Sequence, residues 1–316
     1  MPGLFDEPSS FDRDAFRDRL RSLAADRIYI GGSSWRYEGW LDQIYDRSLY
    51  LHRGKFSKKA FEENCLREYA TVFPAVCGDF SFYQFPGDDF WRKLFSQVPV
   101  PFQFGFKIPE QITCRVFPAH ARYGAQAGLD NPTFLDARLF LDAFLRPLIP
   151  YHANVGVLIF EFGTFARSSF PTVSHFLEHL DPFLNHLPPE FRYAVEIRNA
   201  EFLTQEYLSC LRSHKVAHVF NAWTRMPELS AQLTTPNSVT ADFLVCRALL
   251  RQGRPYEEAV KRFQPYSEVR DPNPSTRKAL REIIQIAKRE KRTAFVFVNN
   301  RLEGNSPDTI VSITHD

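Results

Sequence analysis

Short apolar runs and amphipathic stretches alternate about eight times along this 316-residue chain. Residues 155–160 form an almost wholly apolar run, which is typical of a parallel strand buried on both faces. Residues 275–291 show helical spacing, with basic side chains in the last turn. Strands that alternate with helices form right-handed crossovers and a parallel sheet. Eight such units in a chain of this length favour a TIM-type (β/α)8 barrel, in the α/β class.

The strand and helix patterns cover most of the sequence. The predicted strands are residues 28–30, 76–80, 102–107, 155–160, 193–197, 216–220, 243–246 and 294–298. The predicted helices are residues 57–72, 88–97, 134–148, 172–187, 205–214 and 275–291. Ser57 and Ser275 are the expected N-caps of two of them. Residues 109–132 and 253–273 lack a sustained period and are predicted to be loop insertions, with a short helix at 256–263.

A doubly wound open sheet is the alternative fold. It would require a glycine-rich turn for a dinucleotide directly after a strand. The sequence Gly31-Gly32-Ser33-Ser34 does not supply that pattern, and Trp35 would crowd a pyrophosphate. The closed barrel is therefore the preferred prediction.

The start of the chain is predicted to be an addition to the barrel. Residues 11–25 have apolar side chains at helical spacing, and Ser10 or Asp12 can cap their N-terminus. We therefore divide the chain into an N-terminal helical extension at 1–26 and a single barrel domain at 27–316.

Composition argues against several classes of protein. A formal net charge of +2 provides no basic surface for nucleic acid. The five cysteines and nine histidines share no metal-like spacing, so we expect reduced thiols, no metal site and no cofactor. The N-terminus does not resemble a secretory signal, and the apolar runs are shorter than the ~20 residues that span a bilayer. The expected location is the cytoplasm, away from membranes.

An unusual concentration of aromatic residues follows the first predicted strand. Residues 28–30 run into Gly31-Gly32, and Trp35, Tyr37 and Trp40 come within the next eight positions. Paired glycines allow a tight turn or a close backbone approach. The three rings either pack over one end of the core or form a wall of a ligand pocket.

This stretch has the pattern Gly-x-Ser-x-Trp-x-Tyr-x-x-Trp, and further motifs follow it in order. They are Ser81-Phe82-Tyr83, Phe106-Lys107 with Ile112-Thr113, Val195-Glu196-Ile197-Arg198, Arg247 and Val298-Asn299-Asn300. The ordered set resembles the YecE-like family, also called domain of unknown function 72, from residue 28 to the C-terminus. The resemblance implies a TIM-type barrel without a settled biochemical role.

The chain departs from the pattern of that family at several ionisable positions. The resemblance implies glutamine at position 161, glutamate at 77, asparagine at 79 and aspartate at 221. This chain has Glu161, Cys77, Asp79 and Asn221 at those positions. Histidines implied at 114 and 248 are replaced by cysteine and alanine. These departures raise the question of whether the chain keeps the activity of its relatives.

In a TIM-type barrel, working residues lie at the carboxyl ends of the strands and in the loops that follow. Reading these positions gives the candidate site residues Trp35, Tyr37, Tyr83, Lys107, Glu161, Glu196, Arg198, Asn221, Arg247, Asn299 and Asn300. The family motifs fall on many of the same positions.

Glu161 and Glu196 are the catalytic candidates because they end neighbouring predicted strands. Two nearby carboxylates can have pKa values that are pushed apart, as a general acid and a base or nucleophile require. The alternative is a purely structural pairing, for example of Glu196 with Arg247 or Lys107. Alternation along the strand could point Arg198 away from Glu196.

Three cations on the same ring suggest an anionic ligand. Lys107, Arg198 and Arg247 carry one more charge than the two glutamates, and arginine suits carboxylate or phosphate. Ser306-Pro307 reads as the N-cap and first residue of a helix near the last strand, where an anion can bind. The alternative is an ordinary helix cap.

These features suggest an enzyme that acts on a small anionic or polar ligand, such as a sugar phosphate or a carbohydrate fragment. A catalytically silent binding or scaffold protein is the alternative, favoured by the ionisable groups that are missing. A nucleic-acid processing enzyme is a third hypothesis, against which the near-neutral charge and the absence of metal-like spacing argue. The sequence leaves the reaction and the oligomeric state open.

Overall fold

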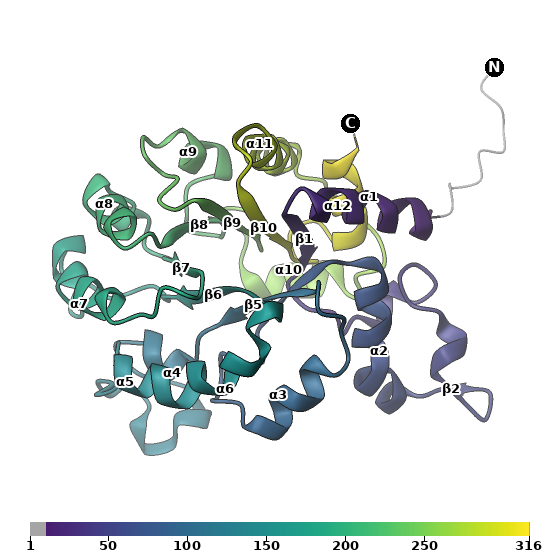
Figure 1. The fold of residues 1–316 in the computed structure, drawn as a ribbon, viewed down its shortest axis with the longest axis horizontal. Coiled ribbons are helices and arrows are strands. Elements are labelled where there is room, and N and C mark those ends of the chain that lie inside the picture. The colour runs from purple at the N-terminus through teal and green to yellow at the C-terminus, as the bar shows by residue number, and fades with distance from the viewer. Residues whose placement is uncertain (1–10, 316) are drawn as a thin grey trace.

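The computed structural model describes residues 11–315, in which eight parallel strands close into a barrel (Figure 1). The strands are β1 (Ile28–Gly32), β4 (Ala75–Gly78), β5 (Gln103–Lys107), β6 (Val155–Glu161), β7 (Tyr193–Glu196), β8 (Ala217–Ala222), β9 (Phe243–Ala248) and β10 (Thr293–Val298). Each barrel strand pairs with the barrel strand before it, and β10 pairs with β1 to close the ring. The predicted (β/α)8 barrel is confirmed.

Helices surround the barrel on its outside (Figure 1). They are α2 (Lys58–Val72), α3 (Asp88–Phe95), α7 (Val173–Asn185), α8 (Gln205–Ser213), α9 (Leu229–Thr234), α11 (Pro274–Glu290) and α12 (Ser306–Thr314). The loops carry α4 (Glu110–Thr113), α10 (Tyr256–Phe263) and a hairpin of β2 (Leu51–His52) and β3 (Lys55–Phe56). Within residues 11–315, no helix is both long and apolar enough to cross a membrane. The α9 helix and the hairpin were not predicted from the sequence.

The helix predicted at 134–148 is interrupted. It consists of α5 (Ala137–Phe140), a π-helical turn over Leu141–Leu145 and α6 (Arg146–Leu148). The start at Ala137 is set by Asp136, whose side chain accepts a hydrogen bond from the Leu139 N–H at 2.9 Å. The π turn ends two residues before Pro147, which has no N–H to continue the regular ladder.

Two predicted N-caps are also wrong. Asn273, not Ser275, caps α11, because its Oδ1 accepts a hydrogen bond from the Thr276 N–H. Asn305, not Ser306, caps α12. In each helix a proline occupies one of the first two positions, where its missing N–H is not needed.

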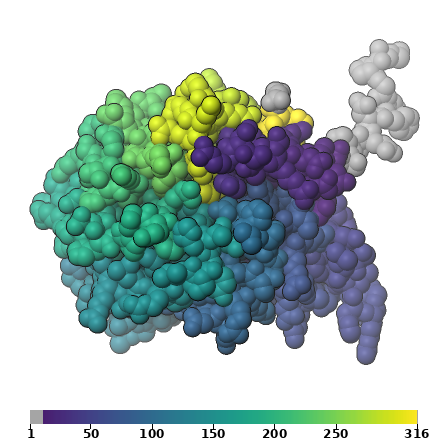
Figure 2. Space-filling model, in the orientation of Figure 1, coloured from purple at the N-terminus to yellow at the C-terminus, as the bar shows by residue number. Residues whose placement is uncertain are grey.

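The N-terminal helix α1 (Arg13–Ala25) packs on the barrel, and Figure 2 shows this purple segment lying along the body of the molecule. Asp12 caps the helix, and Phe16, Leu20 and Leu23 are buried. The Phe16 ring meets Phe73, the residue after α2, edge-on at 5.4 Å. The division of the chain at residue 26 stays a prediction.

The barrel interior is filled by alternate side chains of the strands. Small and branched residues such as Cys77, Val157 and Ala194 form its lower layers together with the rings of Phe295 and Phe297. A second, larger core lies between the strands and the helices. At the carboxyl ends of the strands the inward-facing side chains become polar, and this change positions the candidate site.

The structure explains why the first of the paired glycines, Gly31, must be glycine. A Cβ atom at this position would lie 1.8 Å from the carbonyl oxygen of Ala75 on the neighbouring strand β4. The close approach of β1 to β4 therefore requires glycine here.

Candidate functional site

A layer of polar side chains caps the barrel interior at the carboxyl ends of the strands. Glu161, Glu196 and Arg247 each lie two residues beyond an inward-facing apolar residue. Because side chains of a strand alternate between its faces, these three also point into the barrel. Glu161 and Glu196 are register partners on β6 and β7, as the prediction of neighbouring strand ends required.

Three cations and three carboxylates form one ion-pair network in this layer, which we call the mouth network. Its members are Asp79, Lys107, Glu161, Glu196, Arg198 and Arg247. It joins five strands of the barrel through residues far apart in the sequence.

Each cation of the network contacts two or three carboxylates. Lys107 Nζ lies 3.1 Å from Glu161 Oε2 and 3.5 Å from Asp79 Oδ1. Arg198 Nη2 lies 2.9 Å from Glu161 and 2.7 Å from Glu196, so this arginine does not point away from Glu196. Arg247 Nη1 donates to both glutamates, and its Nη2 lies 3.6 Å from Asp79.

The network has no excess charge. Three cations against two glutamates predict a charge of +1, but Asp79 contributes a third carboxylate and brings the sum to zero. The expectation of a cationic mouth is therefore wrong. Asp79 lies just after β4, and its carboxylate reaches Lys107 and Arg247 in the closed barrel. The spacing of strands in the sequence alone does not reveal these contacts.

The local electrostatics keep Glu161 and Arg247 ionised. Burial opposes ionisation of Glu161, but the three cations, Arg198 foremost, hold the pKa of its carboxyl well below the ordinary value. Burial likewise opposes the charge of Arg247, but Glu196 and the other carboxylates raise the pKa of its guanidinium well above the ordinary value. Both side chains carry their charge at neutral pH.

Two aromatic side chains also shape the network. The Lys107 ammonium lies 3.7 Å from the centre of the Phe82 ring, and the Arg198 guanidinium lies 3.7 Å from the centre of the Trp223 ring. Cation–π contacts of this kind are strongest where water is excluded. Neither ring was among the candidate site residues, because Trp223 lies outside the family motifs and Phe82 lies beside the chosen Tyr83.

The aromatic residues after β1 pack into the structure. Trp35 is 4% exposed and meets Phe80 edge-on at 5.7 Å. Tyr37 packs against Trp40 and Tyr266 at 4.7 and 5.5 Å. The geometry of Trp35 and Tyr37 matches the packing alternative.

Tyr83 differs from these two rings. It is 58% exposed, and the Arg122 guanidinium lies over its ring at 4.6 Å. Arg122 in turn donates to Glu110, at the start of the predicted loop insertion. Tyr83 thus helps to hold that loop over the carboxyl ends of β4 and β5.

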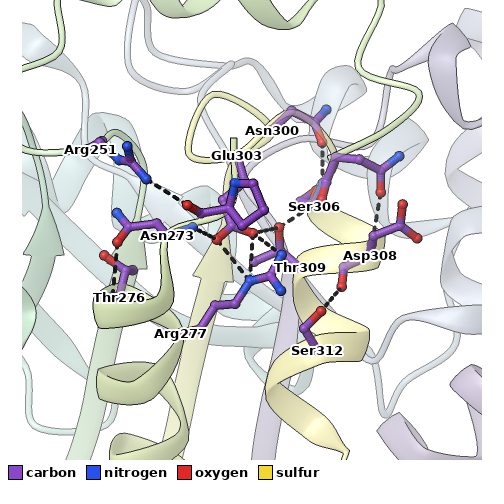
Figure 3. A network of polar contacts seen from close by, with 12 residues as sticks. Arg251, Asn273, Thr276, Arg277, Asn300, Glu303, Ser306, Asp308, Thr309 and Ser312 are labelled. Atoms are coloured by element: carbon purple, nitrogen blue, oxygen red, sulfur yellow. Dashed lines mark hydrogen bonds and ion pairs between the residues drawn. The ribbon is translucent and has the colours of Figure 1, made fainter. Parts of the chain in front are cut away.

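The candidate asparagines hold backbone groups. Asn221 Nδ2 donates to the Ile197 carbonyl at 3.1 Å. Asn299 Oδ1 accepts from the backbone N–H of Arg301, two residues further along, at 2.9 Å. Asn300 Oδ1 accepts from the Ser306 N–H at 2.7 Å, as Figure 3 shows. The start of α12 is therefore capped from within the chain, in agreement with the ordinary-cap alternative.

A buried carboxylate stabilises this same loop (Figure 3). Glu303 is fully buried and accepts hydrogen bonds from Arg277, from the Asn273 N–H and from the Thr309 hydroxyl. It thereby ties the loop after β10 to the starts of α11 and α12. The chain supplies its own anion at these helix starts.

A hollow of about 430 Å³ opens beside the mouth network. Its lining comes mainly from residues 110–118 and 163–169, the loops after β5 and β6. Of the six network residues, Glu161 lines it, and Phe82 forms another part of the wall. Glu110, Thr113, Ser168 and Ser169 add a carboxylate and three hydroxyl groups. Glu161 thus connects the buried charges with a space that is open to solvent.

The family model described as "Protein of unknown function DUF72" matches residues 29–316. The chain belongs to the DUF72 family. This confirms the resemblance seen in the sequence motifs. The family description gives no activity.

The YecE protein of Escherichia coli K12, named as a UPF0759 protein, is 26% identical to this DUF72 chain over 179 residues. The match covers 56% of this chain and 51% of the relative, so the chain spans about half the length of the curated relatives it matches.

Two solved DUF72 structures share the fold. The protein from Thermotoga maritima MSB8 is 18% identical, with a TM-score of 0.59 over 90% of this chain and 97% of that one. The protein from Enterococcus faecalis V583 is 17% identical, with a TM-score of 0.58 over 90% of this chain and 94% of that one. At these identities the likeness extends to the fold alone.

Two of the departures from the DUF72 pattern fall inside the mouth network. The resemblance implies neutral side chains at positions 79 and 161, where this chain has Asp79 and Glu161. Both carboxylates pair with Lys107 and Arg247. The charges that distinguish this chain are therefore matched within its own structure.

Proposed function

We propose that this DUF72 protein binds a small, neutral, hydroxyl-bearing molecule of the carbohydrate type in the hollow beside the mouth network. The main support for this proposal is Glu161, because its carboxylate is held ionised and also lines the hollow. An ionised carboxylate is a strong acceptor for hydroxyl groups.

The character of the lining favours a neutral ligand over an anionic one. Two carboxylates, Glu161 and Glu110, lie in the wall, and the cations behind Glu161 are already paired. Arg115 also lines the hollow, but it lies 3.0 Å from Asp130. Threonine and serine hydroxyls and the rings of Phe82 and Phe165 complete a lining suited to sugar faces and edges.

If the protein is an enzyme, Glu161 would act as a base or as a stabiliser of developing positive charge. A carboxyl group whose pKa is held low is a poor proton donor at neutral pH. Glu196 is fully buried behind it and shares the donor Arg247, which suits a positioning role. A catalytically silent sugar-binding protein would use the same contacts.

The experiment is a thermal-shift and NMR titration of the full chain with neutral mono- and disaccharides and with phosphate esters of the same sugars. We expect saturable binding of a neutral sugar, which raises the melting temperature. Glu161→Gln should weaken this binding about tenfold or more, because hydrogen bonds to charged groups contribute about 1.5–3 kcal/mol. Glu178→Gln, an exposed carboxylate on α7, is the matched control and should bind normally.

Binding of the phosphate esters alone would contradict the proposal and restore the anionic ligand. Equal binding of a neutral sugar by the parent and by Glu161→Gln would remove Glu161 from the site. If no member of the panel binds, the scaffold alternative is favoured instead.

A further inference from the structure

A second cluster of reactive side chains lies on the outer ring of helices. Asp181 on α7, Cys210 on α8 and His214 at the end of α8 place one ligand atom each within 4.8 Å of one another. Figure 1 shows α7 and α8 next to each other, on the outside of the strands β6 to β8. The sequence predicted no metal site, because Asp181 is far along the chain from Cys210 and His214 and no metal-like spacing joins them.

The cluster belongs to a stripe along the contact between the two helices. Glu206, Cys210 and His214 are four residues apart, so they occupy one face of α8 and its C-cap. Glu206 accepts a hydrogen bond from Ser174 of α7 at 3.0 Å. Asp181, two turns after Ser174, meets the other two. The three side chains are therefore held together by the packing of two helices.

The distances approach those of a zinc site. His214 Nε2 lies 2.7 Å from Asp181 Oδ1, and Cys210 Sγ lies 3.7 Å from the same oxygen. Tetrahedral zinc bonds of about 2.0–2.3 Å separate neighbouring ligand atoms by about 3.3–3.8 Å. The sulfur–oxygen distance already fits. The nitrogen–oxygen distance must open by about half an ångström, and the Asp181 side chain is 59% exposed and so has room to move.

We propose that Asp181, Cys210 and His214 form a zinc-binding site that cross-links α7 and α8. Thiolate, imidazole and carboxylate together select zinc or a related transition metal over magnesium and calcium, which prefer oxygen ligands. On binding, the Cys210 thiol releases its proton to solvent and the imidazole binds as the neutral ring. No atom changes its oxidation state. A water molecule would take the fourth position, on the side where Asp181 is exposed.

Two features of the surroundings support a cation here. His214 is the C-cap of α8, and the carboxyl end of a helix favours positive charge. The three ligands also come from two elements, so the ion would join α7 to α8 in the folded chain and stabilise it by mass action. This inference is independent of the sugar-binding proposal, because the cluster lies on helices outside the barrel and the hollow lies at the strand ends.

Cobalt titration of the reduced, metal-free full chain gives the first test. Co²⁺ occupies zinc sites, and a thiolate ligand gives it a near-ultraviolet charge-transfer band. We expect one equivalent of Co²⁺ to produce this band in the parent, and Zn²⁺ to displace it. Cys210→Ser should lose the band. Cys114→Ser, which changes the other half-buried cysteine, should keep it.

The second measurement is independent of the cobalt spectrum. One equivalent of Zn²⁺ should raise the melting temperature of the parent, and a chelator should reverse the rise. His214→Gln, which can still donate to Asp181, should bind Zn²⁺ at least tenfold more weakly while unfolding at the temperature of the metal-free parent. The absence of a charge-transfer band, or its persistence in Cys210→Ser, would overturn the proposal. So would equal Zn²⁺ affinity in His214→Gln and the parent.

Discussion

Glu161 and Glu196 lie side by side at the carboxyl ends of β6 and β7, and both accept a hydrogen bond from the same guanidinium nitrogen of Arg247. Two carboxylates at neighbouring positions and largely shielded from water repel each other unless cations lie between them. Arg247 and Arg198 each contact both glutamates, and Lys107 contacts Glu161. Each charge in the mouth network is thus balanced by at least two oppositely charged partners.

Arg247→Met is expected to destabilise the protein strongly. Removing one partner from a buried ion pair costs about 3–5 kcal/mol, because the remaining charges stay buried without compensation. Arg247 is 2% exposed, its partner Glu196 is fully buried, and the side chain of its partner Glu161 is 12% exposed. Urea denaturation measures the free energy of unfolding. Arg138→Met, at a side chain that is 93% exposed, is the control and should change it by less than about 0.5 kcal/mol. If Arg247→Met lowers the free energy of unfolding by less than about 1 kcal/mol, the other charges of the network do not need Arg247.

The barrel was predictable because its signal is local and repeated. The run at Val155–Glu161 is apolar on both faces and ends in a charge, and the structure makes it β6 with its last residue at the mouth. The same pattern, an apolar run that ends in a charged residue, placed Lys107, Glu196 and Arg247 at strand ends. Alternation then fixes which of these side chains point inwards, so much of the polar layer follows from the sequence.

The features that were missed depend on contacts between distant segments. Asp79 joins the network because β4 and β9 belong to one closed barrel, and its carboxylate cancels the positive charge that was expected at the mouth. Asp181 meets Cys210 and His214 because α7 packs on α8. The helix caps were misplaced for another reason. Asn273 and Ser275 have similar intrinsic preferences as N-caps, and the surrounding contacts decide between them.

The N-terminal helix should contribute measurably to stability. Leu20 is fully buried between α1 and the barrel, so Leu20→Ala should cost about 2–5 kcal/mol. The melting temperature should fall by several degrees, which calorimetry or circular dichroism can measure. Ser22→Ala, at an exposed position of the same helix, tests whether helix propensity alone has an effect and should leave the melting temperature nearly unchanged. Equal melting curves for Leu20→Ala and the parent would mean that α1 is not part of the cooperative unit.

His218 should make the stability depend on pH. Burial lowers the pKa of its imidazole from 6.5 to about 4, and a contact with Gln232 offsets this only in part. Between these values the unfolded chain binds more protons than the folded chain, so stability is highest above about pH 6.5 and falls as the pH is lowered towards 4. The expected loss between about pH 7 and about pH 5 is about 2 kcal/mol.

Urea denaturation at both pH values, on the parent and on His218→Leu, measures this contribution. The variant should be less stable at neutral pH, since the ring packs against Tyr207 and Phe220. Its stability should nevertheless fall less than that of the parent on acidification. Parallel pH dependences in the two proteins would show that His218 takes no part in the effect.

Glu161→Gln should turn the charge-balanced mouth into an anion site. The parent has three carboxylates against three cations, and the variant has two, which leaves a charge of +1 beside the hollow. A cavity with low-dielectric walls focuses such a charge. Phosphate should then raise the melting temperature of the variant saturably and should have no saturable effect on the parent.

The control must separate binding from general salt stabilisation, because phosphate is excluded from protein surfaces and stabilises folded chains without a site. The double variant Glu161→Gln with Lys107→Met restores the balance of two cations against two carboxylates and keeps the same hollow. It should show the exclusion effect alone, a gradual rise without saturation. If the single variant, the double variant and the parent respond alike, the charge balance of the mouth network does not control which ligands enter, and the argument for a neutral ligand loses its electrostatic basis.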